Sequence, residues 1–187
     1  MPYRPKGVLN EFWISAWKLL YNAALSSINN PAGGVGVVET LGSGYSVAEE
    51  EMEKRARIVA FCRAQLGEKY HLGVEVAPGR ESDEWDCSEM VEAAYRDAGL
   101  SIPDGARFQF DACQEVPTPL PGDLGFLWSD KRGMIGHVMV ATEAGTVVHA
   151  VGGRGVVEDD WTTWEANVRW RGWRRHVDLA RPPEDRV

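Results

Sequence analysis

The stretch that decides the fold is DCSEMV, residues 86–91, in a chain of 187 residues. Asp86 and Glu89 form a capping-box pattern, so we expect a helix over residues 87–98. Cys87 then lies in the first turn of that helix, where unpaired backbone N–H groups and the helix dipole favour a thiolate. A buried structural cysteine is the alternative, because free cysteines are often buried.

Two histidines downstream favour the reactive interpretation. His137 and His149 lie in β-type runs that are joined by a short turn containing Gly145. A three-residue loop with Gly145 in the left-handed region would place His149 opposite Met139 and both histidines on one face, about 7–8 Å apart. A cysteine, a histidine base and a second, orienting histidine follow the logic of a catalytic triad, whereas two unrelated strand histidines are the alternative.

The rest of the chain changes from helical to strand-like patterns. Apolar spacing predicts helices over 9–28 and 47–66, and consecutive strands with short turns follow after Pro103. Helices first and antiparallel strands second indicate an α+β fold. The predicted strands cover residues 124–128, 135–141, 146–151, 155–158 and 168–177.

We divide the chain into an N-terminal helical arm with a Gly-rich linker (1–45), a main domain (46–178) and a C-terminal tail (179–187). The net charge of −8 argues against general nucleic-acid binding, and no apolar run is long enough for a membrane span. The Arg- and Trp-rich segment 169–176 is interpreted as a final strand, with His176 at the surface. We expect no secretion signal, and therefore synthesis in the cytoplasm.

Four short segments fall in the order and spacing of one known family. These are Asp86-Cys87-Ser88, Pro121-Gly122-Asp123-Leu124, Gly136-His137-Val138 and Val148-His149-Ala150. Together with the upstream AQLGEKY (64–70), they resemble the NlpC/P60 cysteine peptidases, which are cell-wall hydrolases with a papain-like core. The likeness covers roughly residues 50–177 and implies a Cys-bearing helix packed on a five- or six-stranded antiparallel sheet.

The resemblance also implies roles for residues. Cys87 would be the nucleophile, His137 the general base and His149 the orienting residue. Substrate would be bound near Tyr70, Asp86 and Ser88. The chain departs from the family at Glu89, where a glycine is usual, at Met90, where a bulkier apolar residue is common, and in the loop 71–85.

The resulting hypothesis is a cysteine endopeptidase that cleaves peptidoglycan stem peptides, typically at the D-γ-glutamyl–diaminopimelate bond, without a cofactor or metal. It would act at the bacterial cell wall, delivered as a virion-associated enzyme, with the 1–45 arm contacting phage tail proteins. One alternative is a non-catalytic docking component of such an assembly. Another is an amidase or acyltransferase that uses the same triad on a different substrate.

Overall fold

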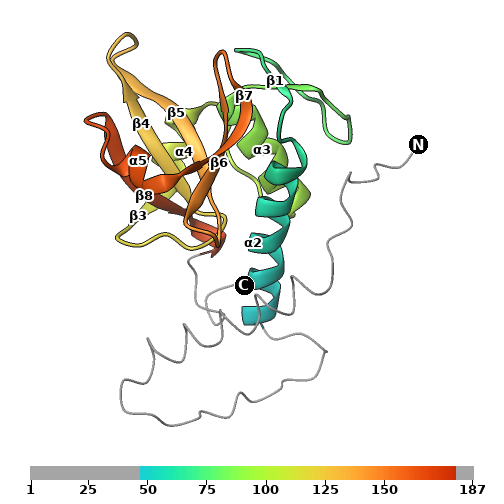
Figure 1. Cartoon of the computed structure of the whole chain (residues 1–187). Helices are drawn as coiled ribbons and strands as arrows, with labels where there is room; N and C mark the ends of the chain where they lie inside the picture. The colour runs from blue at the N-terminus through green and yellow to red at the C-terminus, as the bar shows by residue number, and fades with distance from the viewer. Residues whose placement is uncertain (1–46, 180–187) are drawn as a thin grey trace.

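Helix α2 (Val47–Ala64) and helix α3 (Cys87–Asp97) pack beside each other and against one face of a six-stranded sheet (Figure 1). This computed structural model describes residues 47–179. Both helices lie where the apolar spacing predicts them, whereas the predicted helix 9–28 and the arm 1–45 fall outside the described residues. No helix within 47–179 has both the length and the apolar character needed to cross a membrane.

The sheet has the strand order β3-β8-β4-β5-β6-β7, and every neighbouring pair is antiparallel. The α+β class and the five- to six-stranded antiparallel sheet are therefore confirmed. Its strands are β3 (Cys113–Val116), β4 (Leu124–Ser129), β5 (Met134–Ala141), β6 (Thr146–Val151), β7 (Gly155–Asp160) and β8 (Trp170–His176).

Several short elements were not predicted from the sequence. They are β1 (Lys69–Tyr70), which pairs in parallel with β2 (Glu84–Trp85), strand β3, helix α4 (Ala106–Ala112), helix α5 (Trp161–Glu165) and the 3₁₀ turn η1 (Val177–Leu179). Elements of two to seven residues are too short to show a hydrophobic period. Helix α4 also begins without a side-chain cap, so no start signal marks it.

The β5–β6 hairpin has the predicted register. Val140 lies opposite Val148, and the loop closes with the Thr142 N–H donating to the Thr146 carbonyl at 2.9 Å. Gly145 has φ +75°, the left-handed conformation that this three-residue loop requires. His137 and His149 therefore belong to the same face of the hairpin.

The sheet buries apolar side chains on both faces. One face meets α2 and α3 through Val138, Val140 and Val148, and the other face carries a smaller cluster around Met139 and Trp173. The second cluster requires close approach at Gly125 of β4. A Cβ atom there would lie 2.7 Å from the Trp170 ring and 2.9 Å from the Trp173 ring.

A buried carboxylate joins three parts of this fold. Asp123, in the turn before β4, accepts hydrogen bonds from Arg55 Nη1 of α2 at 2.9 Å and from Arg175 Nη2 of β8 at 2.7 Å. The side chains of Asp123 and Arg55 are completely buried, and Arg175 is largely so. Tyr95 Oη of α3 donates to the Gly122 carbonyl in the same turn, at 2.7 Å. His176 is also buried rather than exposed as predicted, because one ring nitrogen bonds the Ser101 carbonyl at 2.9 Å.

The Asp123→Asn substitution is expected to destabilise the protein by about 3–5 kcal/mol, because it leaves two guanidinium groups without their buried counter-charge. Denaturant unfolding followed by circular dichroism measures the loss. Asp130→Asn, which removes an exposed partner of Arg169, is the matched control and should change stability by less than about 1 kcal/mol. Equal effects of the two substitutions would contradict the role given to Asp123.

Candidate active site

The start of α3 is held by Asp86. Its Oδ1 accepts from the Ser88 and Glu89 backbone N–H groups at 3.0 and 2.9 Å, so the predicted N-cap is confirmed. The reciprocal bond of a capping box is not observed in the described residues. Glu89 Oε1 instead accepts from the Val76 N–H at 3.1 Å, which attaches the loop before β2 to the helix.

Cys87 is the first residue of α3 and lies against β5. Its sulfur accepts a hydrogen bond from the Val138 backbone N–H. Because the Thr142 N–H points toward β6, the N–H groups of Val140 and Val138 point the same way. The β5–β6 ladder has register pairs only at Val140↔Val148 and Ala141↔Val147, so the Val138 donor lies beyond its end and is available to the sulfur.

The prediction that Cys87 is a thiolate is wrong. Burial raises the pKa of Cys87 to about 11, although the hydrogen bonds from backbone N–H groups, including that of Val138, act to lower it. The side chain is buried, with 6% of the residue exposed, and the charge of Asp86 raises the pKa further. Desolvation therefore outweighs the helix start, and the sulfur is a neutral thiol near pH 7.

The two predicted histidines form a hydrogen-bonded pair. His137 Nε2 and His149 Nδ1 are 2.8 Å apart, and His149 Nε2 lies 3.1 Å from Asp159 Oδ2. Burial, with a smaller contribution from His149, lowers the pKa of His137 to about 3, and burial also lowers the pKa of His149. Both rings are consequently neutral near pH 7.

The backbone contact brings Cys87 to the residue after His137. Within residues 47–179, however, no hydrogen bond joins the Cys87 sulfur to the His137 ring. The structure therefore brings the two histidines into direct contact, whereas it links the neutral thiol to the backbone of Val138 and not to either ring. Such a neutral pair can react only if the thiol proton passes to the imidazole as the sulfur attacks.

Two of the three predicted substrate-binding residues, Asp86 and Ser88, adjoin Cys87 in the chain, and Tyr70 interacts with Cys87 electrostatically. Tyr70 is half-buried, and its pKa is raised by burial and by the charges of Cys87 and Asp86. Asp86 and Ser88 are buried, with Ser88 Oγ donating to Asp86 Oδ1 at 2.9 Å. Asp86 Oδ2 also accepts from the Gly73 N–H at 3.0 Å. Asp86 and Ser88 thus already bond within the protein, and a role in binding substrate stays a prediction.

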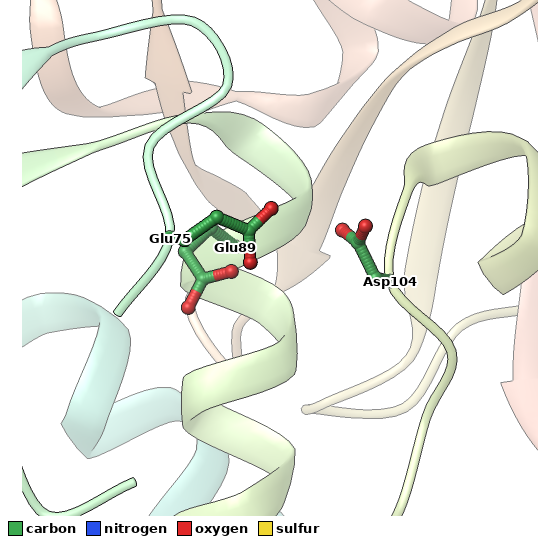
Figure 2. Close-up of side chains that lie close together, drawn as sticks. All are labelled: Glu75, Glu89 and Asp104. Atoms are coloured by element: carbon green, nitrogen blue, oxygen red, sulfur yellow. The ribbon is translucent and has the colours of Figure 1, made fainter. Parts of the chain in front are cut away.

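Glu89 faces two further carboxylates, which Figure 2 shows as Glu75 on the adjoining loop and Asp104 on a separate segment. The three groups offer oxygen atoms within 4.8 Å of one another. Burial raises the pKa of Glu89 to about 7, and the charges of Glu92 and Glu75 add to the increase. Acidic clusters are common without a bound ion, and Glu89 already accepts a hydrogen bond from the Val76 N–H. We therefore do not assign a metal site to these three carboxylates.

Three contributors to the site were not predicted. Val138 provides a backbone donor, Asp159 bonds His149, and Trp164 packs edge-on to the His149 ring with centroids 4.9 Å apart. Asp159 could have been found from strand alternation. Val157 pairs with His149, and Asp159, two residues further along β7, lies on the same face of the sheet as Val157. Trp164 lies on the unpredicted helix α5, so its position could not be inferred.

Comparison with known proteins identifies the family of this fold. The model of the NlpC/P60 family matches residues 67–181. No curated protein matches the chain. A Staphylococcus aureus protein described as similar to a lipoprotein of the NLP/P60 family is 25% identical, with a TM-score of 0.55; the match covers 74% of this chain and 44% of that one.

Two smaller domains match over almost their whole length. The NlpC/p60 domain of the peptidoglycan hydrolase SagA is 25% identical, with a TM-score of 0.52 and coverage of 65% of this chain and 97% of that one. RipD of Mycobacterium tuberculosis, described as a non-catalytic NlpC/p60 domain protein adapted to peptidoglycan binding, is 19% identical, with a TM-score of 0.53 and coverage of 66% and 97%. Four other matched structures, the S. aureus protein among them, are longer, and this chain spans only 40–50% of each.

The Glu89→Gln substitution is expected to stabilise the protein at about pH 8 and to have little effect at about pH 4. The folded-state pKa of Glu89, about 7, exceeds its ordinary value of 4.5, so stability is lost as the pH rises through the folded value. The gain at about pH 8 should be on the order of 2 kcal/mol, measured by denaturant unfolding at both pH values.

Glu53→Gln, on the exposed side of α2, is the control and should change stability little at either pH. A loss of stability in Glu89→Gln at about pH 8 would show that the charged form of Glu89 is favourable in the folded protein.

Proposed function

The chain belongs to the NlpC/P60 family, whose members are generally peptidoglycan hydrolases, and on this premise we propose that it is a cysteine endopeptidase. Its substrates would be peptidoglycan stem peptides, with the D-γ-glutamyl–diaminopimelate bond as the expected target. The observation that supports this proposal best is the position of Cys87. It begins a helix and contacts the N–H of Val138, which follows His137 on β5, and His137 in turn bonds His149.

The reaction would start from neutral groups. His137 accepts the proton of Cys87 as Sγ attacks the substrate carbonyl, which forms a carbon–sulfur bond and a tetrahedral oxyanion. The low pKa of His137 keeps its ring unprotonated near pH 7 but also makes it a weak base, so the transfer requires stabilisation of the charges that form. The Val138 N–H stabilises the thiolate as it forms, since it already bonds the sulfur.

The remaining steps return both groups to their starting state. The carbon–nitrogen bond breaks, the amine leaves with the proton from His137, and a thioester stays on Cys87. Water then attacks the thioester while His137 takes its proton. The carbon–sulfur bond breaks, the acyl product leaves as a carboxylic acid, and the proton on His137 returns to the Cys87 sulfur. The backbone N–H of Cys87 would hold the oxyanion in both stages, since those of Ser88 and Glu89 already donate to Asp86.

A non-catalytic role is the second candidate, because burial of the Cys87 thiol and its raised pKa favour an unreactive sulfur. The chain would then use the same fold to bind peptidoglycan, which is the adaptation described for RipD. The earlier expectations of a virion-associated enzyme, or of a docking component attached through the 1–45 arm, remain proposals. An amidase or acyltransferase with the same three residues would keep the chemistry and change the substrate.

Digestion of purified sacculi is the direct test of hydrolysis. The wild-type protein should release soluble fragments whose masses show cleavage within the stem peptide. Cys87→Ala and His137→Ala should each lower the rate by at least about 1,000-fold, because members of a triad act as a unit. Cys113→Ala, a buried cysteine on β3, is the matched control and should retain activity. Equal product yields from the wild-type protein and Cys87→Ala would refute the proposal that the protein hydrolyses peptidoglycan through Cys87.

Alkylation with iodoacetamide compares the three free thiols in the folded protein. Cys87 has a pKa of about 11, Cys113 has one of about 12, and burial raises that of Cys62 further, so Cys87 should be labelled first. A functional base predicts that His137→Ala slows labelling of Cys87 several-fold and leaves Cys113 unchanged. Peptide mass spectrometry at successive times gives the rates. Labelling of Cys87 that does not depend on His137 would favour the non-catalytic candidate.

A further inference from the structure

His149 lies between two partners, one on each ring nitrogen. Nδ1 is 2.8 Å from His137 Nε2, and Nε2 is 3.1 Å from Asp159 Oδ2. The sheet register explains this arrangement. His149 of β6 lies opposite Val157 of β7, and Asp159 is its diagonal neighbour on the same face.

Asp159 is itself fixed by Arg154. The guanidinium group donates from Nη1 to Oδ2 at 2.8 Å and from Nη2 to Oδ1 at 2.7 Å, which is a bidentate pair. These bonds to Arg154 are the largest cause that lowers the pKa of Asp159, to about 2. Above about pH 3 the carboxylate is therefore ionised, and an ionised carboxylate can only accept hydrogen bonds.

The protonation of both imidazoles follows from this one acceptor. His149 Nε2 must carry a hydrogen in order to donate to Asp159, so the Nδ1 of the neutral ring has a free lone pair. His137 Nε2 must then carry the hydrogen that it donates to His149 Nδ1. The neutral His137 ring is left with its lone pair on Nδ1, which is the nitrogen that bonds neither His149 nor any other residue within 47–179.

We propose that Asp159, held by Arg154, is a positioning residue that sets the tautomers of His149 and His137 and so presents an unprotonated His137 Nδ1 to the Cys87 thiol. This inference rests on the proposed function for its effect on rate. The tautomers themselves follow from the contacts alone. Asp159 acts through the two rings and contacts no substrate.

The next turn of the chain covers the same pair of rings. Asp160 ends β7 and caps α5 by accepting from the Thr162 N–H at 2.8 Å, and one turn later Trp164 packs on both imidazoles. The ring centroids of Trp164 lie 4.9 Å from His149 and 6.3 Å from His137. Such a cover limits access of water, which would otherwise supply alternative donors and acceptors and weaken the tautomer preference.

The test is the Asp159→Asn variant, studied in the full-length protein. An asparagine amide can donate to His149 Nε2, which moves the hydrogen to Nδ1 and reverses both bonds in the chain. His137 Nδ1 then carries the hydrogen and cannot accept the thiol proton. Release of fragments from sacculi should fall by at least about 100-fold, as for the loss of a tautomer-setting aspartate elsewhere.

Two further variants separate positioning from general stability. Arg154→Gln keeps the Asp159 carboxylate and should lower the rate less than Asp159→Asn does. Asp130→Asn removes the carboxylate of another ion pair, with Arg169, and should leave the rate unchanged. Thermal unfolding of each variant identifies any that fails to fold.

Nitrogen-15 NMR of labelled histidines reports the tautomers without any turnover. In the wild-type protein, the hydrogen should be on Nε2 of both His149 and His137, and in Asp159→Asn it should move to Nδ1 of both. A wild-type His149 protonated on Nδ1 overturns the inference, even if Asp159→Asn does not fold. Wild-type protein that is inactive on sacculi but shows the expected tautomers refutes the proposed function and leaves this inference standing.

Discussion

The buried Asp123 carboxylate is the interaction on which the arrangement of this molecule depends. It lies in the turn before β4 and bonds guanidinium groups from α2 and from β8, which are far apart in the sequence. The adjacent Gly122 carbonyl accepts from Tyr95 of α3, so both helices are anchored to the same turn. Charges removed from water at this cost hold their geometry tightly, because displacing Asp123 would leave Arg175 without its carboxylate partner and Arg55 with Glu51 alone. The helix that carries Cys87 is thereby fixed relative to the strands that carry the histidines.

Burial has opposite effects on the two kinds of titratable group at the site. It raises the pKa of the Cys87 thiol and lowers the pKa of the His137 imidazole, so the neutral form of each is favoured. A thiolate–imidazolium pair would place two charges in surroundings that the chain has made largely apolar. The Val138 N–H and the Asp159 carboxylate are the groups placed to compensate those charges as they form. In the free protein the thiol and the imidazole are therefore both neutral. The two groups just named can stabilise the charges that form on them during the reaction.

The sequence predicted most of what local chemistry determines. Gly145 and a three-residue loop specify the hairpin register, and so the shared face of His137 and His149 was predictable. Asp86 was likewise predictable as a helix cap, because the Asp86–Glu89 spacing is a local pattern at the start of the helix. The state of the Cys87 thiol was not, because desolvation depends on α3 packing against β5, and no local pattern records that contact. Helix α5 was missed since its five residues show no period, and the covering role of Trp164 was missed with it.

The early end of the β5–β6 ladder divides the sheet into two leaves, β3-β8-β4-β5 and β6-β7, that share a short seam. Each leaf is tied to α2 separately: Arg55 bonds Asp123 at the start of β4, and Arg63 bonds Glu158 of β7 at 2.9 Å. His137 belongs to one leaf and His149 to the other. A rotation of the leaves about the seam would change the distance between the two rings, which is 2.8 Å from His137 Nε2 to His149 Nδ1. Because α2 bonds both leaves, it couples the position of the leaf that carries His137 to that of the leaf that carries His149.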